Sequence, residues 1–249
     1  MRLCPFISGS VVFALSMILG SAAVGDDRAE ARKVIDKAIQ AVGGQSNLAK
    51  YPAATWKGHV TDFSQGVPLK YTAEFAYQAP AQYRMAAELQ GVFALVISGN
   101  QGWLASGGIT RPMGREELTE HHEELYAFGL ARLLLFKNPA LRLSLTGDDK
   151  VGERPVVGVK VTCQGRRDVV LYFDKETGLL AKLGRRVKAF EQGGKDVLHE
   201  TYFADYKEVS GVKLASKITE KRGGQSYREM EIDDTKLLEK VDNGVFAKP

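Results

Sequence analysis

The sequence predicts a mainly β protein of the α+β class: an antiparallel half-open β-barrel of about ten or eleven strands, with an N-terminal helix and a central helical plug or lid. Three observations support this fold class. Short apolar segments recur at regular spacing, turn residues separate them, and one long apolar helical segment interrupts the series. Because strand twist accumulates, a sheet of this length curls.

Residues 1–25 have the pattern of a secretory signal peptide. Arg2 is a short basic region, residues 11–19 are an apolar run, and residues 21–25 are small side chains that signal peptidase accepts. The apolar run is shorter than the roughly 20 residues that span a bilayer. We therefore expect cleavage near Gly25, a periplasmic or secreted protein, and a single half-barrel domain over residues 26–249.

Composition excludes several classes of function. Once residues 1–25 are removed, Cys163 is the only cysteine, so the core and not a disulfide must stabilise the fold. The net charge of +4 is too small to indicate nucleic-acid binding. Basic pairs near the expected turns leave open a transient contact with anionic membrane lipids.

Residues 27–42 predict an amphipathic N-terminal helix. Val34 and Ile35 lie on its apolar side with residues one turn later, and charged residues surround the other side. Gly43 and Gly44 are expected to end it.

Most of the remaining chain has the pattern of strands. In residues 69–77 and 82–89, apolar side chains alternate with polar ones, which is the period of a strand with one buried face. The other strand-like segments are residues 93–98, 102–106, 141–146, 156–163, 169–173, 179–190, 197–206, 212–221 and 226–233. Glycine-containing turns between them indicate a continuous antiparallel meander.

Residues 116–138 are the long helical segment within this meander. Glutamates in its first half suit the positive end of a helix dipole, and Pro139 is expected to end it. The apolar face that we interpret as the lid contains Leu125, Phe128, Arg132, Leu133 and Phe136. Such a face packs in a core or gates a ligand site, and the sequence leaves both open.

Large apolar residues occupy strand positions expected to face the inside of the half-barrel. We assign a hydrophobic ligand site to Trp56, Tyr71, Phe75, Tyr77, Tyr83, Met85, Leu89 and Trp103. Together they form either a dry core or a lipid-sized cavity.

Several hairpins resemble the LolA/LolB-like superfamily of periplasmic outer-membrane lipoprotein carriers. The strand that begins at Tyr83 after Pro80 is similar to one of its strands, and residues 96–103, VISGNQGW, are similar to the hairpin that follows. Residues 173–180 and 206–214 resemble two further hairpins of its broader relatives. The resemblance extends from about residue 29 to residue 249, and the order of the motifs is more specific than any one of them.

The resemblance implies an unclosed β-barrel around a hydrophobic cavity, with helices as plug or lid, that shields acyl chains in the aqueous periplasm. The carriers have a basic residue before the proline where this chain has Ala79. Arg84 or Arg132 is a candidate to replace that cation near the lid.

The sequence shows no convincing catalytic or metal site. His121 and His122 are adjacent on the expected helix and therefore point about 100 degrees apart, and no histidine follows at metalloprotease spacing. Serines lack a nucleophile elbow, and the carboxylates of Asp205, Asp233 and Asp234 are most simply turn and surface groups. We predict no enzyme, no cofactor and no metal.

The sequence favours a non-enzymatic carrier or sensor that binds a lipid or a lipoprotein acyl chain. The alternative is a structural or interaction domain of the same fold, with a filled core, in a cell-envelope complex. Either function allows an envelope protein as a partner.

Overall fold

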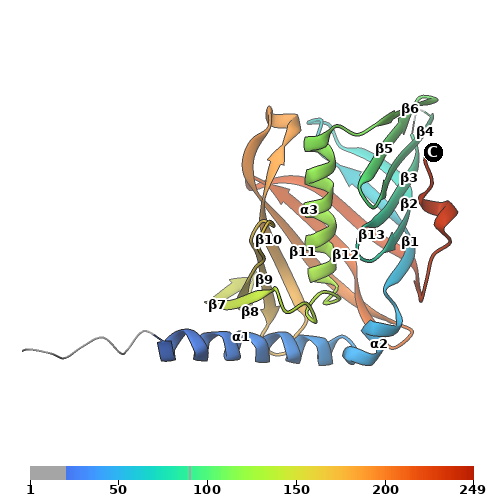
Figure 1. Cartoon of the computed structure of the whole chain (residues 1–249). Coiled ribbons are helices and arrows are strands. Elements are labelled where there is room, and N and C mark those ends of the chain that lie inside the picture. The colour runs from blue at the N-terminus through green and yellow to red at the C-terminus, as the bar shows by residue number, and fades with distance from the viewer. Residues whose placement is uncertain (1–20, 90) are drawn as a thin grey trace, which may run out of the picture.

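The computed structural model describes residues 21–89 and 91–249, and in them thirteen antiparallel strands form a single sheet (Figure 1). The strands are β1 (Ala53–Asp62), β2 (Leu69–Gln78), β3 (Gln82–Leu89), β4 (Gly91–Ser98), β5 (Gln101–Ser106), β6 (Ile109–Pro112), β7 (Arg142–Val151), β8 (Arg154–Thr162), β9 (Val169–Asp174), β10 (Leu180–Ala189), β11 (Lys195–Val209), β12 (Val212–Arg222) and β13 (Gln225–Leu238). The helices are α1 (Ser21–Ala41), α2 (Gly44–Lys50) and α3 (Arg115–Ala131), with short 3₁₀ turns η1 (Phe190–Gln192) and η2 (Asn243–Phe246).

The first strand and the last strand are neighbours in the middle of the sheet. The strand order is β6-β5-β4-β3-β2-β1-β13-β12-β11-β10-β9-β8-β7. From β1 the chain builds outward to the edge at β6, crosses through α3 to the opposite edge at β7, and returns strand by strand to β13. The two edges are therefore consecutive in the sequence, and α3 lies across the face that the curved sheet encloses (Figure 1).

The prediction of ten or eleven strands was too low: the eleven strand-like segments do not include β1 and β6, although Trp56 of β1 was expected at an inward strand position. Lys57, Gly58 and His59 interrupt the apolar pattern in the middle of β1, and β6 is four residues long and ends at Pro112. The mainly β antiparallel class is confirmed. The edge strands β6 and β7 do not pair with each other, so the sheet is not closed into a barrel.

The helices α1 and α2 lie along one end of the sheet (Figure 1). Ile35 and Ala38 of α1 are fully buried, as the predicted apolar side requires. At the corner between the helices, Gly43 has a φ of 121°, and a Cβ there would lie 2.0 Å from the carbonyl oxygen of Gly211. Only glycine allows this approach, which lets the Lys213 N–H donate to the Val42 carbonyl at 2.8 Å.

The helix α3 ends at Ala131, seven residues before the predicted end. Leu133 adopts the left-handed conformation with a φ of 59°, and its N–H and that of Leu134 bond the carbonyls of Leu130 and Gly129. This is the Schellman arrangement that ends many helices, with leucine where glycine is usual. The prediction was wrong here because Pro139 supplied a stop signal and Leu133 did not.

The two faces of the sheet carry separate cores. The main core lies on the enclosed face, against α1, α2 and α3. A smaller core on the outer face covers part of β1 to β5 with the C-terminal segment, and contains Ala53, Ala76, Val96, Val241 and Phe246. Parts of these strands are therefore buried on both faces.

Exposed large apolar side chains gather at the end of the sheet opposite α1 and α2. Within the described residues they are Val67, Leu69, Leu89, Val92, Ile109, Phe190 and Leu198. All of them lie in or beside the turns β1–β2, β3–β4, β5–β6 and β10–β11, which the strand register places at this end. We call this set the apolar rim.

Among the described residues, no helix combines the length and the apolar character needed to cross a membrane. The predicted signal peptide falls mostly on residues 1–20, which lie outside the described residues.

Candidate functional site

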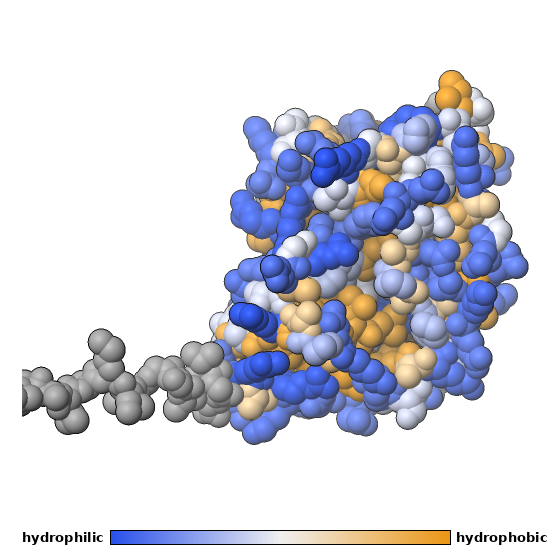
Figure 2. Space-filling model, in the orientation of Figure 1, coloured by the Kyte–Doolittle hydropathy of each residue, from blue (hydrophilic) through white to orange (hydrophobic). Residues whose placement is uncertain are grey.

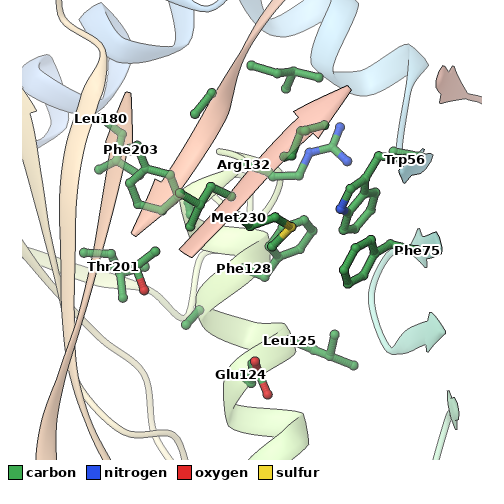
Figure 3. Close-up of a pocket in the computed structure, with 18 of the residues that line it drawn as sticks. Trp56, Phe75, Glu124, Leu125, Phe128, Arg132, Leu180, Thr201, Phe203 and Met230 are labelled. Atoms are coloured by element: carbon green, nitrogen blue, oxygen red, sulfur yellow. The ribbon is translucent and has the colours of Figure 1, made fainter. Parts of the chain in front are cut away.

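A cavity of about 200 Å³ lies between α3 and the enclosed face of the sheet (Figure 3). Leu125 and Phe128 of α3 form one wall, and Trp56 of β1 with Phe75 of β2 form another. The wall opposite comes from β10 to β13 and includes Leu180, Leu183, Thr201, Phe203, Tyr206, Leu214, Ile218, Met230 and Ile232. Both halves of the chain line the cavity because β1 and β13 are neighbours. Apolar surface within a hydrophilic surround is visible from outside (Figure 2).

Seven of the thirteen residues proposed from the sequence line this cavity. From the strands they are Trp56, Phe75 and Tyr83. From the segment predicted as lid they are Leu125, Phe128, Arg132 and Leu133. The structure therefore brings the α3 segment and the inner positions of β1 to β3 together.

The other six proposed residues do not line the cavity. Tyr71, Tyr77, Met85 and Phe136 pack in or against the main core. Leu89 is 38% exposed and belongs to the apolar rim. Trp103 packs against the outer core, so the expectation that it faces the inside is wrong, because η2 and the C-terminal segment bury the outer face of β5 as well.

Aromatic rings fasten the second half of α3 to the first strands. The ring of Phe128 stacks on Trp56, which in turn stacks on Phe75 with centroids 5.1 Å apart. Tyr77 meets Phe128 edge to face at 4.8 Å. Burial raises the pKa of Tyr77 to about 12, so its hydroxyl stays protonated at neutral pH. These contacts close one side of the cavity.

Ionic contacts fasten the first half of α3 to the other side of the sheet. Glu120 binds the guanidinium of Arg167 and accepts a hydrogen bond from the backbone N–H of Lys188 at 3.1 Å. Glu123 accepts from Arg166 at 3.0 Å and from the backbone N–H of Arg167 at 2.9 Å. These glutamates, which the sequence explained by the helix dipole alone, also clamp the helix over β8, β9 and β10.

A cluster of charged groups closes the cavity beside this clamp. His121 and Glu124 of α3 share a hydrogen bond of 3.2 Å. Glu220 of β12 lies 3.7 Å from Arg228 of β13, and Arg185 of β10 is 7% exposed. Acids and bases thus oppose one another, which offsets part of the cost of removing charges from water.

The pKa shifts in this cluster follow from burial and from these neighbours. Burial opposes ionisation of Glu124, but the hydrogen bond from His121 and the charges of Arg185 and Arg228 outweigh it and hold its pKa well below the usual range. Burial raises the pKa of Glu220, and Glu124 adds to the rise. The cavity therefore has an apolar body and, at this end, a cluster of charged groups.

His199 of β11 belongs to the same charged end and is neutral at physiological pH. Burial, together with the charges of Arg185 and Arg222, lowers the pKa of His199 to about 3. Its Nδ1 accepts a hydrogen bond from Arg222 at 3.2 Å, which fits a neutral imidazole.

Most of the cavity residues that sequence reasoning missed belong to β10 to β13. The alternation of Thr201 and Phe203 was a usable signal, because both face the cavity. Tyr206 breaks that alternation and still faces the cavity, since Asp205 has a φ of 53° and rotates the strand. A period-two reading of β11 would have placed Tyr206 on the outer face.

The candidate catalytic and metal-binding groups are dispersed. His121 lines the cavity, whereas His122 bonds the carbonyl of Gly99 at 2.8 Å. Asp233 pairs with His59 on the surface, at 3.1 Å. No group of three or more potential metal ligands occurs in residues 21–89 and 91–249.

The fold and the cavity define a class of protein in which a curved antiparallel sheet encloses one helix and an apolar hollow. No protein-family model matches the chain, and no curated protein sequence does. Several solved structures match the fold of the chain. A LolA superfamily protein from Nitrosomonas europaea matches with a TM-score of 0.58 and 10% identity, over 88% of this chain and 97% of that chain.

Two further structures agree with this match. A domain named for outer membrane lipoprotein sorting, from Vibrio parahaemolyticus, has a TM-score of 0.57 and 9% identity, over 89% of this chain and 97% of that chain. A DUF1329 family protein from Desulfovibrio piger has a TM-score of 0.55 and 11% identity, over 87% of this chain and 97% of that chain. The protein has the LolA-like fold, and the resemblance seen in the hairpins is confirmed at the level of the fold.

Proposed function

We propose that the protein is a periplasmic carrier or sensor that holds a lipid, or the acyl part of a lipoprotein, in the cavity under α3 without catalysing a reaction. The observation that carries the proposal is the apolar lining, to which α3 and both halves of the sheet contribute. Each methylene that leaves water is worth about 0.8 kcal/mol, so such a lining suffices to extract a chain from an aqueous phase.

The size of the cavity indicates how a ligand is accommodated. Pockets for drug-sized ligands measure roughly 300–1,000 Å³, and the cavity of about 200 Å³ is smaller. In this state it admits a segment of a single chain. A longer occupant requires α3 to move away from the aromatic contacts at Trp56, which is the role of a lid.

The proposed compartment follows from residues 1–25 as a signal peptide, with residues 26–249 as the exported domain. The names of two structural neighbours, which refer to the LolA superfamily and to lipoprotein sorting, agree with a role in the cell envelope.

A transient membrane contact is part of the proposal, and the apolar rim is the surface for it. Val67 and Ile109 are 74% and 73% exposed at two different hairpin turns of the same end. Side chains dispersed over several turns suit the interface of a bilayer, where each is buried separately, better than one compact protein partner.

The alternative is an interaction domain of the same fold, with a partner protein of the envelope and no ligand. In that case side-chain movements would fill the cavity in solution. Whether the purified protein contains a bound ligand decides between the two functions.

The test is native mass spectrometry and lipid extraction on protein purified gently from a periplasmic preparation, with uptake of a fluorescent fatty acid as a second readout. A Thr201→Trp variant fills the cavity, and Thr219→Trp adds the same volume on the other face of the neighbouring strand. We expect bound acyl species in the wild type and in Thr219→Trp, and their loss in Thr201→Trp. An empty wild type that also takes up no fatty acid would contradict the carrier and favour the alternative.

A further inference from the structure

Arg132 differs from the other arginines of the cavity because no carboxylate of the described residues lies close enough to oppose its charge. It follows the last residue of α3, and its guanidinium points into the cavity on the side of Trp56 (Figure 3). Its Nε is buried and has no hydrogen-bond partner, and it makes no ion pair with the described residues. Its one close neighbour of suitable chemistry is the ring of Tyr77, 6.0 Å from the guanidinium carbon.

The other two arginines of the cavity, Arg185 and Arg228, have carboxylates near them. Arg228 lies 3.7 Å from Glu220, and Glu124 opposes the charge of Arg185. Burial lowers the pKa of Arg132 to about 10, and only Tyr77 opposes the change, yet the group remains a cation at neutral pH. The protein thus keeps an unneutralised positive charge in its apolar cavity.

A structural role explains this arrangement poorly. A cation near a helix C-terminus interacts favourably with the dipole, but this effect is small compared with the desolvation of an unpaired charge. The aromatic contact is at the limit of the useful range for a cation. An apolar side chain of the same length would fill the site at lower free energy. The charge therefore indicates that the partner of Arg132 is a bound ligand and not another residue of the protein.

We propose that Arg132 binds the oxyanion of a single-chain anionic amphiphile, with a carboxylate or a phosphate as its head group, whose chain lies along the apolar walls of the cavity. The inference rests on the proposed function and adds to it the ligand class and the orientation of the ligand. The guanidinium has five N–H donors in a planar fork, which matches a carboxylate or phosphate through two parallel hydrogen bonds. Phe128 and Phe203 then contact the chain.

The orientation follows from the two polar parts of the cavity. At the charged end, the carboxylates of Glu124 and Glu220 face Arg185 and Arg228, so an anion bound there would lie beside two carboxylates. Arg132 lies one turn beyond Phe128, at the C-terminal end of α3, whereas Glu124 lies one turn before Phe128. The head group therefore lies toward α2, and the chain runs back under α3.

The experiment compares three probes of equal chain length, dodecanoate, dodecyl phosphate and dodecanol, by calorimetry at pH 7.5. We expect the wild type to bind at least one of the two anions about tenfold more tightly than the alcohol, and the preferred anion identifies the head group. Arg132→Met should bring this ratio to about one while the affinity for dodecanol is unchanged. Arg132→Lys should keep part of the preference, because it keeps the charge and loses the fork.

The matched control is Arg84→Met. Arg84 lies on β3 opposite Ala76 and Val96, residues of the outer core, so the change removes the same charge outside the cavity and should leave the ratio as it is. Thermal melts of the unliganded variants supply an independent readout. Arg132→Met should melt at the same temperature as the wild type or above it, because it removes an unpaired charge that the fold partly buries.

The outcomes separate the two proposals. If the wild type binds all three probes equally, or Arg132→Met weakens anions and alcohol alike, the role of Arg132 is overturned and the carrier stands. A clear fall in melting temperature for Arg132→Met, with an unchanged anion preference, would show a structural role instead. If no probe binds the wild type, the carrier itself fails, and the inference fails with it.

Discussion

Phe128 of α3 stacks on Trp56 of β1 with ring centroids 5.8 Å apart and planes inclined by 20°. This contact joins the helix between the two sheet edges to the strand at the centre of the sheet. Phe128 also meets Tyr77, a residue of the main core, edge to face. The helix α3 is therefore held by aromatic contacts near its end and by ionic contacts near its start.

The aromatic anchor should contribute strongly to stability. Replacing Phe128 with alanine removes its contacts with Trp56 and Tyr77, and we expect a loss of about 3 kcal/mol in the free energy of unfolding. Urea denaturation followed by tryptophan fluorescence measures it. Phe190→Ala, at a site that is 47% exposed, is the control and should cost less than about 1 kcal/mol. Equal losses in the two variants would show that the stack is not an anchor.

The ionic clamp should hold the first half of α3. Glu120→Gln weakens the contacts with Arg167 and the Lys188 N–H, and we expect a loss of about 2 kcal/mol, since hydrogen bonds to charged groups contribute most. Hydrogen exchange should rise in α3 before it rises in β1. The exposed neighbour Glu116, changed to glutamine, should alter neither quantity. A double-mutant cycle with Arg167→Met that gives no coupling energy would exclude the clamp.

Stability should depend on pH through His199. Its pKa is about 3 in the folded protein against 6.5 without burial, so below about pH 6.5 the unfolded chain binds a proton that the folded protein excludes. The contribution of His199 is complete above that pH and falls by about 1.4 kcal/mol per pH unit down to about pH 3. Urea titrations from pH 8 to pH 4 should show this slope in the wild type and a smaller slope in His199→Asn.

The decisive comparison is between the wild type and His199→Asn at each pH. If His199→Asn and the wild type differ by a constant free energy at every pH, the histidine does not titrate as the structure requires.

The apolar rim should determine membrane association. A Val67→Asp, Val92→Asp double variant introduces charge at sites that are 74% and 66% exposed, and we expect vesicle binding to fall by about tenfold with no change in stability. Co-sedimentation with vesicles that contain anionic lipid measures it. The matched control, Ser46→Asp with Ala140→Asp, adds the same charge at the opposite end, in α2 and beside α1. Equal losses would mean that overall charge, and not the rim, governs binding.

The sequence by itself determined the local structure and the class of fold. Apolar alternation in residues 69–77 and 82–89 specified strands, glycine-containing turns specified hairpins, and the periodicity of residues 116–138 specified the interrupting helix. These signals are local, because the side-chain period follows from backbone geometry alone. They sufficed to propose Trp56 and Phe75 for a hydrophobic site and Phe128 for the helix that covers it.

Only the tertiary structure decided which face of each strand is inside and which residues meet. Trp103 has the alternation of an inward residue, yet the C-terminal segment around Phe246 buries the outer face, and periodicity cannot distinguish two buried faces. The pairing of β1 with β13 brings Phe203 opposite Phe128, although 75 residues separate them in the sequence. Arg132 was visible as one cation on an apolar helix, but its lack of a counter-charge depends on every group around it.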